Sequence, residues 1–259
     1  MHPFKRTSDL SGTTLLELII GLLITSILVA GAFQAYRYTM DSANREKKKA
    51  ELQGDIITFS NIIEKDIRMA GCGMPGNGLY ADYSVPELMI FTNENGDETT
   101  LSRVVQPIHA EAIVEDGSAF VVRGGICIAA DGVDTIYRKV TGIGMYDLGP
   151  DTVYFSPAAN TSTLMPAGSK VYPAMCFRYT VSGTLPDRKI LRSRNSQTVP
   201  IGGIIDSIRV TLKDEDGSPT GGATKNAAMM TVVMGGFIGK GGNRVFLADS
   251  TEVNLRNRK

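Results

Sequence analysis

Among the side chains that could do chemistry, Glu17 stands in the most unusual setting. It interrupts a run from Thr13 to Phe33 in which every other residue is apolar or small. A charged side chain inside hydrocarbon costs roughly 2.5 to 3.5 kcal/mol even on mild insertion scales, so an acid in such a run is a functional hypothesis by default. The chemistry open to Glu17 is ion pairing, and we expect its partner to be a cation.

The cysteines are a second group of reactive side chains. The chain has three of them, Cys72, Cys127 and Cys176, and we expect all three in an exported region where oxidation is permitted. One disulfide is then the maximum, three pairings are open, and the third thiol is expected to be buried. No Cys-x-x-Cys spacing occurs, which argues against a zinc site.

The remaining candidates favour loops over catalysis. His109 follows a proline in an expected loop, and no nucleophile motif accompanies it. The glycine-rich stretch 235–242 is one residue short of a phosphate loop and lacks its Ser or Thr. The acidic turns at 93–98 and 214–217 do not complete an EF-hand loop. We therefore predict no enzymatic activity, no cofactor and no metal site.

The run from Thr13 to Phe33 must position Glu17. At about 1.5 Å per residue it spans roughly 30 Å, the thickness of one hydrocarbon core, so we expect a membrane-spanning helix. A polar leader, residues 1–12, precedes it with Lys5 and Arg6. More basic residues follow the span than precede it, but they are mixed with acids, and we expect the chain beyond the span to be exported.

The same helix is expected to continue beyond the apolar run. Residues 34–70 contain no proline, and apolar side chains recur at steps of three and four: Leu52, Ile56, Phe59, Ile63 and Ile67. Charged residues, Asp66 among them, are assigned to the other positions of a half-buried amphipathic helix. The stretch 71–76, which holds glycines and a proline, should end it.

Beyond residue 70 the composition changes to that of a β-rich domain. Of 28 glycines only Gly12, Gly21, Gly31 and Gly54 lie before residue 70, and Pro3 is the one proline there. Turn pairs such as Asn95-Gly96 and Asp216-Gly217 separate short β-branched or aromatic runs. The expected strands are 88–92, 119–123, 135–140, 152–155, 176–181, 207–212 and 229–234. We predict an α+β protein with a mainly antiparallel globular domain at 71–259.

The N-terminal pattern resembles the signal of type IV prepilins. In that family a peptidase cuts after a glycine that precedes the apolar helix, the new N-terminus is methylated, and a glutamate at the fifth mature position meets the α-amino group of a neighbouring subunit. The resemblance implies cleavage between Gly12 and Thr13, methylation of Thr13 and an assembly role for Glu17. Thr13 departs from the phenylalanine that most prepilins carry.

Later segments resemble one branch of that superfamily, the PilW-type minor pilins. Residues 66–72 read D-I-R-M-A-G-C, like the run with a nearby cysteine at the end of that family's long helix. Residues 134–138 resemble its early strand, and 191–192 followed by 204–210 resembles a strand-to-strand passage. The closing stretch 244–258 resembles the last strand with its L-R-N ending.

The resemblance implies a structural subunit of the priming or tip complex that initiates a type IV pilus. Its expected partners are other minor pilins, the major pilin, the inner-membrane assembly platform and the prepilin peptidase that also methylates. With 27 basic and 27 acidic side chains, the chain's balance does not argue for nucleic acid. A J-type pseudopilin of type II secretion and a membrane-tethered adhesin remain alternatives, the first with the same layout and the second with the helix as a tether only.

Overall fold

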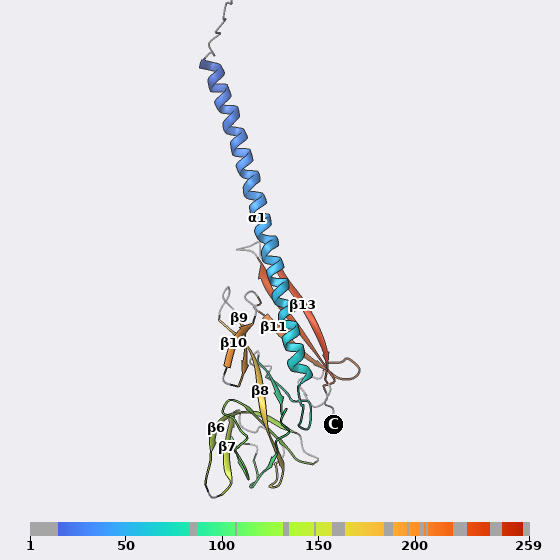
Figure 1. Ribbon diagram of the computed structural model, residues 1–259. Coiled ribbons are helices and arrows are strands. Elements are labelled where there is room, and N and C mark those ends of the chain that lie inside the picture. The colour runs from blue at the N-terminus through green and yellow to red at the C-terminus, as the bar shows by residue number, and fades with distance from the viewer. Residues whose placement is uncertain are drawn as a thin grey trace, which may run out of the picture. The chain divides into compact units, whose positions relative to one another are not determined.

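The structure is a computed structural model. It describes residues 15–82, 87–106, 108–131, 135–147, 149–156, 164–183, 189–195, 197–201, 205, 207–219, 227–238 and 245–255. The chain divides into two units, residues 1–49 and 50–259. The α1 helix, Leu15–Arg68, contributes to both as a single element (Figure 1).

Within the first unit, α1 has no buried residue from Leu15 to Lys49. Within the second unit the same helix has a buried face, formed by Leu52, Ile56, Phe59, Ile63 and Ile67. This is the stripe that the three-and-four spacing predicts. The change reflects composition, because only the second stretch combines one apolar stripe with charged residues around the rest of the helix.

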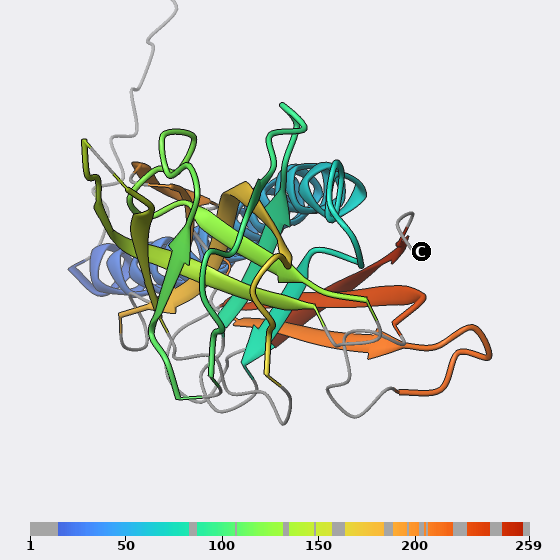
Figure 2. The same cartoon turned by 90° about the horizontal axis from the view of Figure 1, so that it is seen from below.

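The strands of the second unit form two antiparallel sheets. The larger follows the order β1-β2-β8-β5-β6-β7-β4, with β3 and β9 also paired to β8 and β10 paired to β9. Its strands are β1 Leu79–Asp82, β2 Glu87–Thr92, β3 Thr99–Thr100, β4 Glu111–Val114, β5 Gly125–Ala129, β6 Ile136–Gly144, β7 Asp151–Ser156, β8 Lys170–Ser182, β9 Lys189–Arg194 and β10 Gln197–Ile201. The smaller contains β11 Ser207–Lys213, β12 Met229–Ile238 and β13 Val245–Asn254 in that order. Figure 2 shows the orange and red strands of the smaller sheet as a separate layer.

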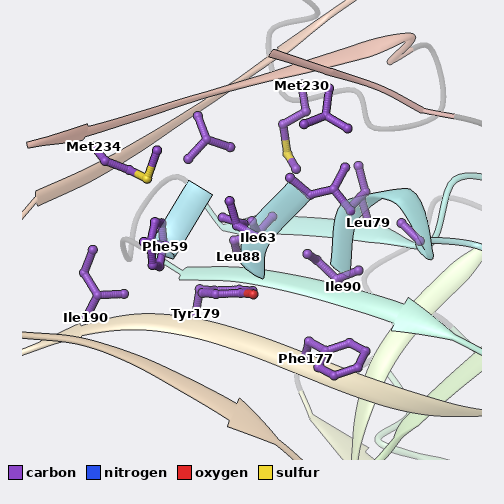
Figure 3. Packing of buried hydrophobic residues seen from close by; sticks show 14 of the residues in the cluster. Phe59, Ile63, Leu79, Leu88, Ile90, Phe177, Tyr179, Ile190, Met230 and Met234 are labelled. Atoms are coloured by element: carbon purple, nitrogen blue, oxygen red, sulfur yellow. The ribbon is translucent and has the colours of Figure 1, made fainter. Parts of the chain in front are cut away.

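The buried helical face lies between these two sheets. Figure 3 shows Phe59 and Ile63 with Met230 and Met234 of β12 on one side and Tyr179 of β8 on the other. The ring of Phe59 meets that of Tyr179 edge to face at a centroid distance of 5.8 Å, an arrangement that aromatic pairs prefer. Apolar residues of all three layers thus form one core, and the α+β prediction is confirmed.

The segment that follows α1 is held tightly against β2. The Gly71 N–H donates to the carbonyl of Phe91, and the Phe91 N–H donates to the carbonyl of Gly78. Gly78 has a φ of +65°, and a Cβ on it would lie 2.0 Å from the nitrogen of Gly71. Because a side chain fits neither that conformation nor that space, glycine is required here.

The expected strand at 119–123 is wrong. The N–H of Phe120 donates to the carbonyl of Gly117, that of Gly124 donates to the carbonyl of Val121, and Arg123 has a φ of +70°, so the segment is a pair of turns. Val121 is 56% exposed. β-branched residues favour strands mainly through packing on a half-buried surface. Because Val121 is exposed, this packing does not stabilise a strand here.

Candidate functional site

Glu17 lies in the first turn of α1 and is exposed. Between Leu15 and Tyr36 it is the only ionisable residue. An 18-residue window of this helix has a mean hydropathy of 2.4 and no buried residue. The helix is therefore long and apolar enough for a membrane span or a signal sequence.

The polar side chains near Glu17 are satisfied inside the helix. The Thr25 hydroxyl donates to the carbonyl of Gly21 at 2.7 Å, and the Ser26 hydroxyl donates to that of Leu23 at 2.8 Å. Such bonds to the preceding turn let a hydroxyl stay in hydrocarbon without an unpaired donor. Between Leu15 and Tyr36, Glu17 is the one side chain that carries a charge. Gly12 and Thr13, the predicted cleavage and methylation sites, lie outside the described residues.

The other end of α1 carries a buried acid. Asp66 is only 2% exposed, so its assignment to the outer positions of the amphipathic helix is wrong. The Arg192 Nε donates to Asp66 Oδ2 at 2.7 Å, Arg192 Nη2 donates to Oδ1 at 2.8 Å, and the Tyr179 hydroxyl donates to Oδ2 at 2.5 Å. A bidentate guanidinium and a phenol therefore satisfy both carboxylate oxygens.

The surroundings of this cluster reinforce the ion pair. The hydrogen bond to Asp66 raises the pKa of Arg192. Burial raises the pKa of Tyr179, and the nearby carboxylate raises it further. The guanidinium of Arg192 also lies 4.6 Å from the ring centroid of Phe177, within cation–π range. Arg192 therefore stays charged and Tyr179 neutral at ordinary pH. The cluster joins α1 to β8 and β9.

The sequence prediction does not include the partners of Asp66, although the spacing of Asp66 along the helix indicates that it needs one. Asp66 follows Phe59 by seven residues and Ile63 by three, which puts it on the apolar face as surely as Ile67. An acid at a core position needs a buried cation. Arg192, in the segment 191–192 that resembles part of a strand-to-strand passage, supplies it.

The three cysteines are free thiols: Cys72 is exposed, whereas Cys127 and Cys176 are buried. Burial raises the pKa of Cys176 to about 12 and raises that of Cys127 as well. Cys127 of β5 lies opposite Tyr172 of β8. Cys176 is four residues further along β8, which separates the two by more than about 12 Å.

Cys72 is no better placed for a disulfide. Its carbonyl accepts from Asn93 beside β2, on the edge away from β8, while Cys176 lies opposite Phe91 across the other edge. Two strand spacings, roughly 10 Å, exceed the Cα separation of about 7 Å that a disulfide tolerates. The geometry therefore favours three thiols over the single disulfide expected from the sequence.

The acidic turns and His109 lie in loops, whereas the glycine-rich stretch begins within β12 at residues 235–238 and continues outside the described residues. The ring Nδ1 of His109 accepts from the N–H of Gln106 within the same turn. Among the residues that the structure describes, no group of three His, Cys, Asp or Glu side chains is placed to hold a metal ion. The absence of a cofactor and of catalysis stays a prediction.

Because the comparisons with known proteins find no match, the architecture is the observation that bears on function. No protein-family model, no curated protein and no solved structure matches this chain. A long apolar N-terminal helix followed by antiparallel sheets is a pilin-like architecture.

We predict that Arg192→Met destabilises the second unit by about 3 to 5 kcal/mol, because it leaves the buried Asp66 carboxylate without its cation. Arg68→Met is the matched control, since Arg68 pairs with Glu64 at an exposed i,i+4 position and should cost below about 0.5 kcal/mol. Unfolding of the full chain in detergent measures both. Equal effects of the two substitutions would contradict a special role for the Asp66 cluster.

Adding Asp66→Leu to Arg192→Met should recover part of that loss, because an apolar pair leaves no uncompensated charge.

A second prediction concerns the thiols. Labelling of the denatured, unreduced protein should find three free cysteines, and labelling of the native protein should modify Cys72 alone. Cys72→Ser is the control, which should abolish the native label. A count of one in the denatured protein would instead support the disulfide expected from the sequence and would require a strand register other than the one described.

Proposed function

We propose that this protein is a minor subunit of a type IV pilus that acts in the priming or tip complex of the filament. The observation that carries the proposal is α1, a single helix of 54 residues. Its apolar N-terminal part has no buried residue, and its C-terminal part has a face built into a β-rich core. One helix thus offers a surface for lipid or for other helices and also carries a folded domain.

The exposed apolar surface calls for a non-aqueous environment. Leu15, Leu22 and Leu28 are 79%, 63% and 67% exposed, and apolar residues continue around the helix between them. Soluble monomers rarely leave contiguous apolar patches of this kind in water. In the proposal the segment first spans the inner membrane, with the β-rich domain in the periplasm, and then packs against other pilin helices in the filament.

Glu17 would set the order of assembly. Processing after Gly12 would place a new α-amino group at Thr13, four residues before the carboxylate. In a staggered bundle the amine of one subunit can pair with Glu17 of the next. Each charge is costly when it stands alone in lipid, and the cost falls when the two charges meet. The pair would therefore select the correct stagger and disfavour the isolated chain.

The subunit would perform no reaction, and its partners would be other minor pilins, the major pilin and the inner-membrane assembly platform. The prepilin peptidase would act on it once, before assembly. A J-type pseudopilin shares this layout. The identity of the subunits that copurify with the protein distinguishes the two, since pilins support the proposal and pseudopilins the alternative.

The proposal predicts processing between Gly12 and Thr13. Intact-mass analysis of protein from cells with an active prepilin peptidase should find a chain that begins with N-methyl-Thr13. Gly12→Val should block the cut and leave residues 1–12 attached, because the peptidase of the family reads this glycine. Recovery of unchanged Met1 from cells that process their other pilins would contradict the assignment.

It also predicts that Glu17→Ala leaves the protein in the membrane and the β-rich domain folded, since removing a charge eases insertion. Association with partner pilins should fall about a hundredfold or more, because an uncompensated buried charge costs about 3 to 5 kcal/mol. Copurification with partners and pilus counts measure the effect. Glu46→Ala, an acid on the same helix beyond the apolar run, should change neither. Normal piliation with Glu17→Ala would mean that the helix is only a tether.

A further inference from the structure

A groove of about 680 Å³ lies within the second unit, between the last turns of α1 and the β9–β10 hairpin. The helix contributes Thr58, Ile62 and Lys65, which share one face at steps of four and three. The hairpin contributes Arg194 and residues 199–201. The volume is within the range of sites that bind a ligand or a short peptide segment.

The groove borders the Asp66 cluster, in which the charges of Asp66 and Arg192 offset each other. Asp66 lines the groove, and its carboxylate is already neutralised by Arg192. Any charge recognition must come from the other ionisable side chains of the lining, which are Lys65, Arg194 and Glu94.

Two of these three, Lys65 and Arg194, are cations. Among the described residues, no carboxylate forms an ion pair with Lys65 or Arg194. The Arg194 Nε lies 3.0 Å from the sulfur of Met175, and its guanidinium carbon lies 5.9 Å from the ring centroid of Phe177. Glu94 pairs with neither cation, so the lining has an excess of unpaired positive charge.

The rest of the groove is apolar and partly exposed. Phe177 of the lining is buried, while Val199 on β10 is 59% exposed. Among the described strands β10 pairs only with β9, so it is an edge of the sheet. Pro200 removes one backbone donor from this edge, which disfavours continuation by a further strand. An occupant is therefore recognised through its side chains.

We propose that this groove receives an acidic segment of a neighbouring subunit, with a carboxylate held between Lys65 and Arg194 and an apolar side chain against Val199 and Phe177. The proposal rests on the proposed function for the existence of that neighbour. The charge complementarity commits the groove to an acid, because a basic or neutral segment would leave both cations unpaired in a partly dehydrated interface.

The test is photo-crosslinking in cells that express the full chain together with its neighbouring pilin genes. A photoreactive phenylalanine analogue replaces Val199 at the groove, Leu22 in the apolar helix or Val121 as a matched control. Val121 is 56% exposed and lies outside the groove. Val199 and Leu22 should each yield an adduct with another subunit, and Val121 should not. The peptide joined at Val199 should contain Asp or Glu.

Charge reversal supplies the decisive comparison. Lys65→Glu with Arg194→Glu should reduce the Val199 adduct about tenfold or more while the Leu22 adduct persists, which shows that the variant still folds and associates. Changing the acid of the crosslinked peptide to lysine should restore the Val199 adduct with that variant.

Several outcomes would overturn the inference. A Leu22 adduct without a Val199 adduct, a Val199 adduct that survives charge reversal, or an equal adduct at Val121 would each overturn the groove while leaving the proposed function intact. Absence of adducts at both Leu22 and Val199 would overturn the proposed function as well.

Discussion

The carboxylate of Asp66 is the point on which the packing of the second unit depends. It is the one acid among the fully buried residues described for α1, and its two oxygens are taken by side chains from β8 and β9. A buried charge tolerates little displacement from its partners, whereas apolar neighbours tolerate some sliding. The cluster therefore fixes two quantities: the position of the helix along β8 and the rotation of the helix about its own axis. β8 pairs with β2, β3, β5 and β9. The position of the helix on β8 therefore also sets its position relative to most of the larger sheet.

Local patterns predicted the helix and six of the strands that the structure describes. The stripe from Leu52 to Ile67 is the observed helical face, and the helix ends at Arg68, just before the glycines. Six of the seven expected strands lie within or overlap observed ones. What local patterns could not supply is the order of strands, because β8 meets partners distant in the chain on both edges. The turns at 119–123 also escaped prediction, since the exposure of Val121 depends on tertiary packing.

The sequence indicates a candidate residue most clearly where a single side chain carries the signal, and the assembly role of Glu17 stays a prediction. Glu17 is conspicuous because nothing else between Leu15 and Tyr36 can ionise, and the structure leaves its setting as the sequence describes it. Asp66 was misplaced because counting charged residues as outward-facing overrode its spacing from Phe59. The cysteines could not be paired from spacing, because the register that separates Cys127 from Cys176 is a property of the assembled sheet.

Two methionines of β12 help to pack the smaller sheet against α1. Met230 and Met234 are fully buried against the helix, and the Ser60 hydroxyl donates to the sulfur of Met234 at 3.9 Å. Methionine fills irregular gaps without a strict shape, so β12 can settle on the helix with little strain. An oxidant can reach these sulfurs only when the smaller sheet lifts away. Conversion to the polar sulfoxide would then hinder its return. Sulfoxide at Met230 or Met234 would therefore be a chemical sign that this layer had opened.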